Sequence, residues 1–264
     1  MRSSEHGSVL LLPAAAAGRF CRRLFRYLAV LSALFHLALR NTLLPPYNGW
    51  SAVRRITVMQ IYFTGVQALP LFLFLALLLG LSISTLPGSA TELQVLLLNT
   101  VLMEGVPIIT AFVILGRSGT AVTVELGNMT VLGEIRQLRR MGIDPVRHVV
   151  FPRLAGVTLS TLVLSGLFVL SVAGVTVLLS GRPFLTFAQD LVKGWSAAEV
   201  GALVLKSAVF GWIIAMVSCY QGLNLVPETT EVPKAVIRTV IHGILLCGTV
   251  NALLAYLRFK VTGA

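Results

Sequence analysis

The sequence predicts an all-α polytopic membrane protein with an N-terminal interfacial helix, five transmembrane helices and a cytoplasmic helix between the second and third spans. Composition carries the first part of this prediction. Of 264 residues, 56% are hydrophobic and only 12% are charged, whereas a typical soluble domain has about 25% charged residues. So little charge cannot cover a water-exposed surface of this size, and the mean hydropathy of +0.88 agrees.

Five apolar runs carry the second part, because each has about the 20 residues that a helix needs to cross the hydrocarbon core of a bilayer. They lie at approximately residues 61–82, 93–115, 154–180, 200–223 and 236–257. The sequence therefore predicts five membrane spans.

Basic residues orient these spans. The chain has 21 Lys and Arg residues and a formal net charge of +11. Lys206 falls inside a span, and only four of the others fall on one side of the membrane: Arg182, Lys193, Arg258 and Lys260. Cytoplasmic segments carry the excess of Lys and Arg, so the N-terminus is predicted to be cytoplasmic and the C-terminus outside. Their clustering beside apolar spans favours anionic lipid and argues against nucleic acid as the partner of this charge.

Residues 1–55 are predicted to form a cytoplasmic N-terminus that contains the interfacial helix, and residues 56–264 the membrane domain. The first 17 residues make a poor signal peptide, because Glu5 interrupts the basic region and Pro13 breaks a short apolar stretch. In residues 18–40, four arginines share one helix face: Arg19, Arg22, Arg23 and Arg26. This pattern favours a helix lying in the membrane interface. The alternative, a true span, is weaker because about 13 residues between Arg26 and Arg40 are too few to cross a bilayer.

The stretch between the second and third spans, residues 116–152, is polar and basic and has helix start and stop residues of its own. Val131–Met141 is predicted to be a short helix that ends at Gly142, with arginines in its last turn. Asp144 and Pro145 then supply a cap and a first-turn proline for a second helix, and the chain re-enters the membrane near Pro152. Two helices at a membrane face indicate a docking element; the alternative is a merely solvated loop.

Two charged residues fall inside predicted spans, where charge is costly and is usually functional. Glu104 lies near the middle of the second span, three residues before Pro107, which frees a backbone carbonyl there. Lys206 lies near the outer end of the fourth span. Its ammonium group either snorkels to the interface or guides anionic lipid. His242 is expected to be a structural hydrogen-bonding residue.

The chain shows no pattern for catalysis. Cys21, Cys219 and Cys247 are odd in number and scattered, which indicates small packing residues. There is no Ser/His/Asp or Cys/His arrangement, no histidine pair with metal spacing and no G-x-x-x-x-G-K-[ST] segment that would bind ATP. The chain is therefore predicted not to be an enzyme, to hold no metal or cofactor, and to draw its energy from a partner or from a gradient.

The segment GRSGTAVTVELGNMTVLGEIRQLRRMGIDPVRHVVFPRLAG resembles the signature region of the MlaE family, the permease subunits of ABC-type phospholipid transporters. Residues 206–210 (KSAVF), Gln221-Gly222 and residues 238–242 (RTVIH) are also similar to the family. The likeness runs from about Ile56 to Leu257 and covers most of the chain.

The resemblance implies that the loop holds a coupling helix seated in a groove of a cytoplasmic ATPase that binds the ATP. The residues that match are Glu134, Arg136, Leu138, Arg139 and Met141 on the helix, with Gly142, Asp144 and Pro145 shaping its end.

The resemblance also implies a homodimer with a lipid cavity on its axis, lined by the first, second and last spans. Helical spacing suggests Leu73, Leu77 and Leu78 as apolar lining residues, together with Met103 and Glu104. The family often has an arginine where this chain has Met103. Glu104 therefore lacks an adjacent cation, and it is either protonated or paired with a charge from another helix.

As further partners the resemblance implies membrane phospholipid and a periplasmic substrate-binding protein with an MCE domain. It implies a bacterial inner membrane, with an organelle membrane of bacterial descent as the alternative. Two other readings remain on the residues alone. A secondary transporter or channel for a small amphipathic solute would need more ionisable residues at mid-membrane. An intramembrane enzyme would need a visible acid and nucleophile.

Overall fold

The computed structural model describes residues 50–85, 98–179, 189 and 195–262. The chain divides into two compact units, Met1–Pro45 and Pro46–Ala264, and every described residue lies in the second. This described part consists of helices joined by turns and contains no strand, which confirms the all-α prediction. The predicted interfacial helix in residues 18–40 lies outside the described residues, and the predicted boundary after residue 55 stays a prediction.

Five helical segments are long and apolar enough to cross a membrane, as the sequence predicts. They cover Val53–Ser84, Leu98–Val131, Val146–Leu179, Ala197–Leu223 and Glu231–Arg258. Each exceeds the apolar run that predicted it, because a helix continues past the hydrocarbon core wherever its backbone hydrogen bonds remain satisfied.

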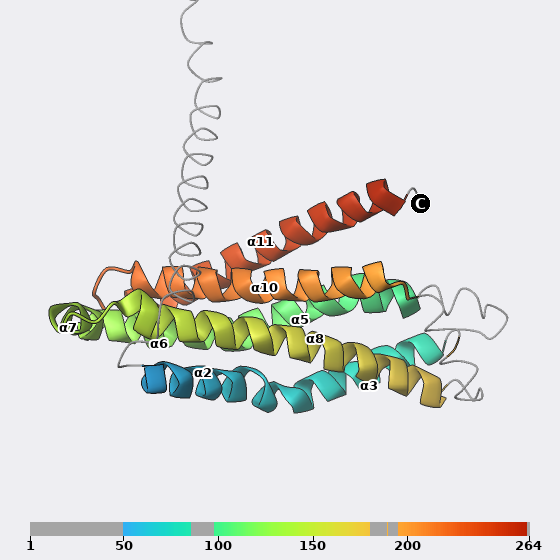
Figure 1. The fold of residues 1–264 in the computed structure, drawn as a ribbon, viewed down its shortest axis with the longest axis horizontal. Coiled ribbons are helices and arrows are strands. Elements are labelled where there is room, and N and C mark those ends of the chain that lie inside the picture. Colours follow the sequence, from blue (N-terminus) through green and yellow to red (C-terminus); the bar gives the residue numbers. More distant parts are fainter. Residues whose placement is uncertain (1–49, 86–97, 180–188, 190–194, 263–264) are drawn as a thin grey trace, which may run out of the picture. The chain divides into compact units, whose positions relative to one another are not determined.

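These segments contain short irregular turns within longer α-helices (Figure 1). The first span comprises α2 (Trp50–Thr64), the 3₁₀ turn η1 (Val66–Ala68) and α3 (Leu69–Ser84). The second comprises the π-turn η2 (Val101–Gly105), α5 (Val106–Ile114), the π-turn η3 (Leu115–Gly119) and α6 (Thr120–Val131). The helix α7 (Glu134–Arg140) and the π-turn η4 (Val146–Val150) lead into α8 (Phe151–Leu179), which is followed by α10 (Ala197–Leu223) and α11 (Glu231–Thr262).

The helices α8 and α10 pack side by side and form the centre of the described unit. The first span lies along α8, whereas α6 and α11 lie along α10 (Figure 1). Small residues permit the close approach. A Cβ on Gly211 of α10 would come within 2.8 Å of the Thr158 backbone on α8, and a Cβ on Gly156 would come within 2.7 Å of Gln60. Small residues at such positions let the backbones of neighbouring membrane helices approach closely.

The sequence predicts two short helices in the polar stretch at residues 116–152, and the structure has more helix there than that. The second span does not end at Leu115 but turns through η3 and continues as α6 to Val131. A glycine in the left-handed conformation, Gly133 with φ of 77°, then separates α6 from α7, so the short helix starts at Glu134 and not at Val131. The second predicted short helix is continuous with the third span, and Pro152 is buried inside it.

Candidate functional site

A cluster of four charged side chains joins three helices at the end of the described unit opposite α7. Its members, the charge cluster, are Glu104 of η2, Glu199 and Lys206 of α10, and Arg258 of α11. The Lys206 ammonium donates to Oε2 of Glu104, and Arg258 Nη1 donates to Oε1 of the same carboxylate at 3.1 Å. Arg258 Nη2 donates to Oε1 of Glu199 at 2.9 Å. One guanidinium thus ties the last span to the second and the fourth.

Local structure positions each carboxylate. Pro107 has no N–H to donate to the carbonyl four residues earlier, and the helix before it adopts a π-turn that carries Glu104. Such turns are frequent at functional sites. Glu199 lies in the first turn of α10, where it forms a capping box with Ser196: the Ser196 N–H donates to Glu199 Oε2 at 3.0 Å, which leaves Oε1 for Arg258.

The four side chains differ in burial. The Lys206 side chain is only 6% exposed, whereas that of Glu104 is 28% exposed. Arg258 is 34% and Glu199 28% exposed. A buried ammonium needs a charge partner in a low dielectric, and Glu104 supplies it. The cluster therefore combines one buried cation, Lys206, with three partly exposed charged side chains.

These contacts decide two sequence alternatives. Glu104 pairs with charges from other helices, one of the two options left open for it. The alternative that Lys206 snorkels to the interface is wrong. Lys206 lies nine residues after the start of α10, and its ammonium group donates to Glu104. The sequence missed Arg258 and Glu199. Arg258 was counted only as a flanking basic residue, and nothing local indicates a partner 154 positions away.

The apolar candidates separate into two groups. Leu73, Leu77 and Leu78 of α3 are exposed. Met103 is buried, which argues against an open lining position in the single chain. The physical reason is that neighbouring side chains on a helical turn point in different directions, so Met103 faces inward where Glu104 faces the cluster.

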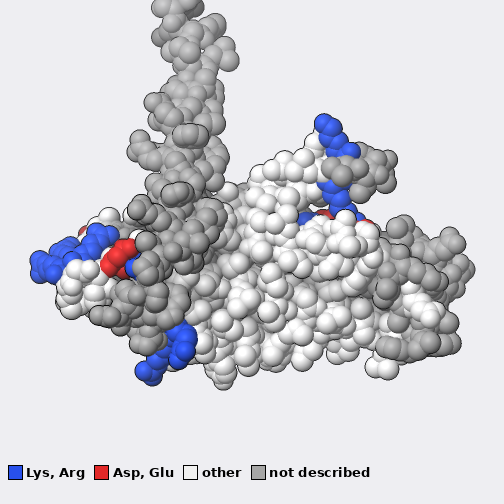
Figure 2. Space-filling model, in the orientation of Figure 1, with Lys and Arg blue, Asp and Glu red and all other residues white. Residues whose placement is uncertain are grey.

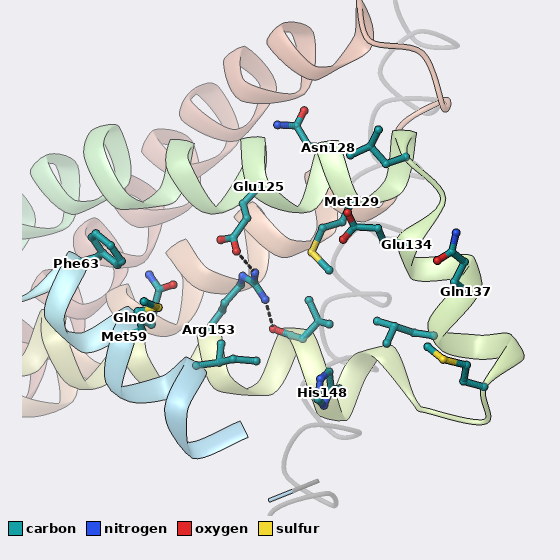
Figure 3. A pocket seen from close by; sticks show the side chains of 15 residues that line it. Met59, Gln60, Phe63, Glu125, Asn128, Met129, Glu134, Gln137, His148 and Arg153 are labelled. Carbon is teal, nitrogen blue, oxygen red and sulfur yellow. Dashed lines mark hydrogen bonds and ion pairs between the residues drawn. The ribbon is translucent and has the colours of Figure 1, made fainter. Parts of the chain in front are cut away.

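A pocket of about 730 Å³ lies beside α7, between α2, α6, η4 and the start of α8 (Figure 3). From α2 it is lined by Met59, Gln60 and Phe63. Three of the matched helix residues also line it: Glu134, Leu138 and Met141. Because α7 forms a wall of this pocket, a displacement of α7 would change its width.

Two residues that line this pocket, Arg153 and Glu125, form an ion pair that the sequence did not predict. Arg153 of α8 is buried, and its Nη2 donates to Glu125 Oε1 of α6 at 2.5 Å while its Nη1 donates to the Val149 carbonyl at 2.8 Å (Figure 3). In the sequence Arg153 falls just before the third predicted span, among the basic residues of the cytoplasmic side. Its burial shows that it is a structural tie between the second and third spans.

The turn that follows α7 has the predicted local structure. Gly142 adopts φ of 76°. Its N–H donates to the Arg139 carbonyl and the Ile143 N–H to the Leu138 carbonyl, the two bonds of a Schellman motif. Asp144 Oδ1 then accepts from the Val146 N–H at 3.0 Å and caps the next helix.

The other matched residues take up distinct places. Arg136, Arg139 and Asp144 are exposed, whereas Pro145 is buried at the start of the next helix. The α7 element therefore presents basic groups outward and holds its apolar side against the protein.

A further tie connects the first two spans. Arg117 Nη1 donates to the Phe63 carbonyl at 2.8 Å, and Nη2 donates to Gln67 Oε1 at 2.9 Å. Phe63 lies in the last turn of α2 and Gln67 in η1, so Arg117 binds the chain where regular α-helical bonding is interrupted. The expected hydrogen bond of His242 is also present, because its Nδ1 lies 3.0 Å from Gln221 Nε2.

On the face shown in Figure 2, charged side chains gather at the two ends of the described helices, with uncharged surface between them. This distribution matches a protein whose middle is in contact with lipid tails. Five apolar spans, a charge cluster at one end and a separate helical element at the other define a multi-pass membrane protein with the parts of a transporter subunit.

The chain belongs to the MlaE permease family, whose model, described as "Permease MlaE", matches residues 57–257. It is 30% identical over 224 residues to the probable ABC transporter permease protein slr1045 of Synechocystis, covering 80% of this chain and 84% of that protein. It is 29% identical over 218 residues to the intermembrane phospholipid transport system permease protein MlaE of Haemophilus influenzae, covering 77% and 83%. These relationships identify a membrane permease of an ABC-type system.

Proposed function

We propose that this permease moves phospholipid between the membrane and an acceptor protein, driven by a separate ATPase subunit that docks on α7. The observation that carries the docking role is the shape of the α7 element. Its glycine-terminated turn and its Asp144 cap fix the direction of α7, and Arg136 and Arg139 are exposed on it. Exposed basic residues on a rigid helix suit an acidic groove on a partner protein.

The substrate assignment is supported by the name of the Haemophilus influenzae relative, an intermembrane phospholipid transport permease, and by the chemistry of the charge cluster. Glu104 would contact the headgroup, with the buried Lys206 paired to it from inside, and the exposed Leu73, Leu77 and Leu78 would contact the acyl chains. Met103 is buried and is left out of this set. No covalent step is needed, because moving a lipid requires only that the cavity open and close.

The assembly we propose is a homodimer with one ATPase bound to each α7, and a periplasmic MCE-domain protein as lipid carrier. The last span supports the dimer, because it leaves most of its surface for a neighbouring subunit to cover. Of the residues in its most apolar stretch 11% are buried, compared with 28–56% in the other four spans. The basic residues beside α7 support a cytoplasmic location for that end and an outside location for the C-terminus. A bacterial inner membrane is the proposed location.

The test is to purify the chain together with the products of its neighbouring genes and to ask whether an ATPase co-purifies. The variant Arg139→Glu/Asp144→Ala reverses one exposed charge and removes the cap acceptor, so ATPase binding should fall while membrane insertion is kept. Asp144→Asn retains an acceptor for the Val146 N–H and is the matched control for the cap. A chain that transports lipid without ATP, or a double variant that assembles normally, would contradict the proposal.

A further inference from the structure

The charge cluster points to a specific headgroup. We propose that it selects a zwitterionic phospholipid whose headgroup carries a primary amine, with Arg258 and Glu199 as the specificity-determining residues. This inference rests on the proposed function, because it names the kind of phospholipid that the permease prefers.

The positive and negative charges of the cluster balance. The four side chains comprise two carboxylates and two cations, and each carboxylate is held by at least one cation. Arg258 is shared between Glu104 and Glu199 through its two terminal nitrogens. A planar guanidinium with two outward N–H edges is also the best side-chain match for a phosphate.

Three of the four side chains are accessible to a ligand. Arg258, Glu104 and Glu199 each keep between 28% and 34% of their side-chain surface exposed, whereas Lys206 is nearly closed off. Figure 2 shows side chains of both charge signs meeting in the recess beneath the C-terminal part of α11. An incoming headgroup can therefore reach Arg258 and Glu199 without first displacing the buried lysine.

Binding of a headgroup exchanges ion pairs within the cluster for ion pairs with the lipid. A phosphate that takes the terminal nitrogens of Arg258 releases Glu199 from the guanidinium that holds it in the described part of the chain. If the lipid carries no cation, that carboxylate is left without compensation in a region of low dielectric, which is unfavourable. If the same headgroup brings an ammonium group, it can donate to Glu199, and every charge stays paired. A choline headgroup neutralises the charge but has no N–H to donate, so it should bind less well than a primary amine.

The surroundings indicate a lipid and not a soluble zwitterion. On α11, Leu253, Tyr256 and Leu257 are exposed next to Arg258 in sequence, and Val204 is exposed on α10. Both helices are membrane spans by length and composition. An exposed apolar surface beside a charged recess fits a molecule with a polar head and acyl chains.

The experiment uses the full chain, purified in mild detergent from cells whose membranes contain amine-bearing zwitterionic, choline and anionic phospholipids. Bound lipids are quantified by mass spectrometry relative to the membrane extract. Wild type should enrich the amine lipid over the anionic lipid by about three- to fivefold, the ratio expected for one partly exposed ion pair. Millimolar glycerophosphoethanolamine, the soluble headgroup, should not displace the bound lipid.

Variants test which residues set the preference. Glu199→Gln gives the cluster an excess positive charge and should shift binding toward the anionic lipid. Glu199→Gln/Arg258→Gln removes one charge of each sign, leaves Glu104 and Lys206 paired, and should fold but lose the preference. Lys260→Gln changes an exposed charge on the same helix and should leave the preference unchanged.

The outcomes separate this inference from the proposed function. The bound phospholipids could instead have the same proportions as in the membrane, and the variants could leave these proportions unchanged. That result would overturn the headgroup selectivity and leave the permease role intact. Displacement by the soluble headgroup would overturn the lipid assignment of this cluster. A wild-type protein that carries no phospholipid above the detergent background would contradict the proposed function itself.

Discussion

Glu104→Gln should destabilise the permease strongly, because it leaves the Lys206 ammonium buried without an anion. Gln keeps the size of the side chain and one acceptor oxygen but removes the charge that compensates Lys206. Arg258 is less affected, since Glu199 still accepts from it at 2.9 Å. The loss therefore falls mainly on one buried ion pair.

The magnitude follows from burial. Removing one partner of a fully buried ion pair costs about 3–5 kcal/mol. Glu104 is 28% exposed and Lys206 only 6%, so the lower end, about 3 kcal/mol, is expected. The double variant Glu104→Gln/Lys206→Met removes both charges and should recover to within about 1 kcal/mol of the wild type. The second substitution should therefore recover about 2 kcal/mol of the stability that Glu104→Gln alone removes.

Tryptophan fluorescence during denaturant unfolding in detergent micelles measures these differences. Trp195 is a local reporter, because its indole N–H donates to Asn99 Oδ1 at 3.1 Å at the start of α10. Glu228→Gln removes an exposed carboxylate and is the matched control, expected to change stability by less than about 0.5 kcal/mol. A Glu104→Gln protein as stable as this control would show that the pair with Lys206 does not form.

Four further substitutions, one of them a control, test the helix packing, the turn after α7 and the ion pair between α6 and α8. Gly211→Leu should destabilise the protein by about 1–3 kcal/mol because its side chain meets the backbone of the facing helix, whereas Gly166→Ala, where a Cβ meets nothing within 4 Å, should be neutral or stabilising in the same unfolding assay. Gly142→Ala should cost about 1–2 kcal/mol through its positive φ and weaken ATPase binding in a pull-down; unchanged binding would separate the turn from docking. Glu125→Gln should cost about 1 kcal/mol, because Arg153 is buried but Glu125 is largely exposed, and an unchanged unfolding midpoint would show that this tie contributes little.

The sequence predicts those parts of this protein that depend on local chemistry. Five apolar runs predict five spans, and the glycine, aspartate and proline at residues 142, 144 and 145 predict the turn after α7, because capping needs only neighbouring residues. The continuation of the second span into α6 was missed, since its polar residues were taken as a loop although a helix in contact with other helices tolerates them.

The ties between helices could not be read from the chain. Glu104 meets Lys206 and Arg258 across 102 and 154 positions, and only the packing of three spans brings them together. Spacing places Glu104 inside a span but does not say which way neighbouring helices face. For the same reason Arg153 looked like a loop charge, although it is buried between α6 and α8.

Reconstituted lipid transfer tests the proposed mechanism most directly. Proteoliposomes containing the permease, its ATPase and a labelled phospholipid are incubated with the soluble carrier protein, and transferred lipid is measured with ATP, with a non-hydrolysable analogue and without nucleotide. Transfer should require ATP hydrolysis and should fall to the nucleotide-free level in Arg139→Glu/Asp144→Ala. Transfer at the same rate without ATP, or undiminished transfer by that variant, would contradict an ATP-driven permease coupled through α7.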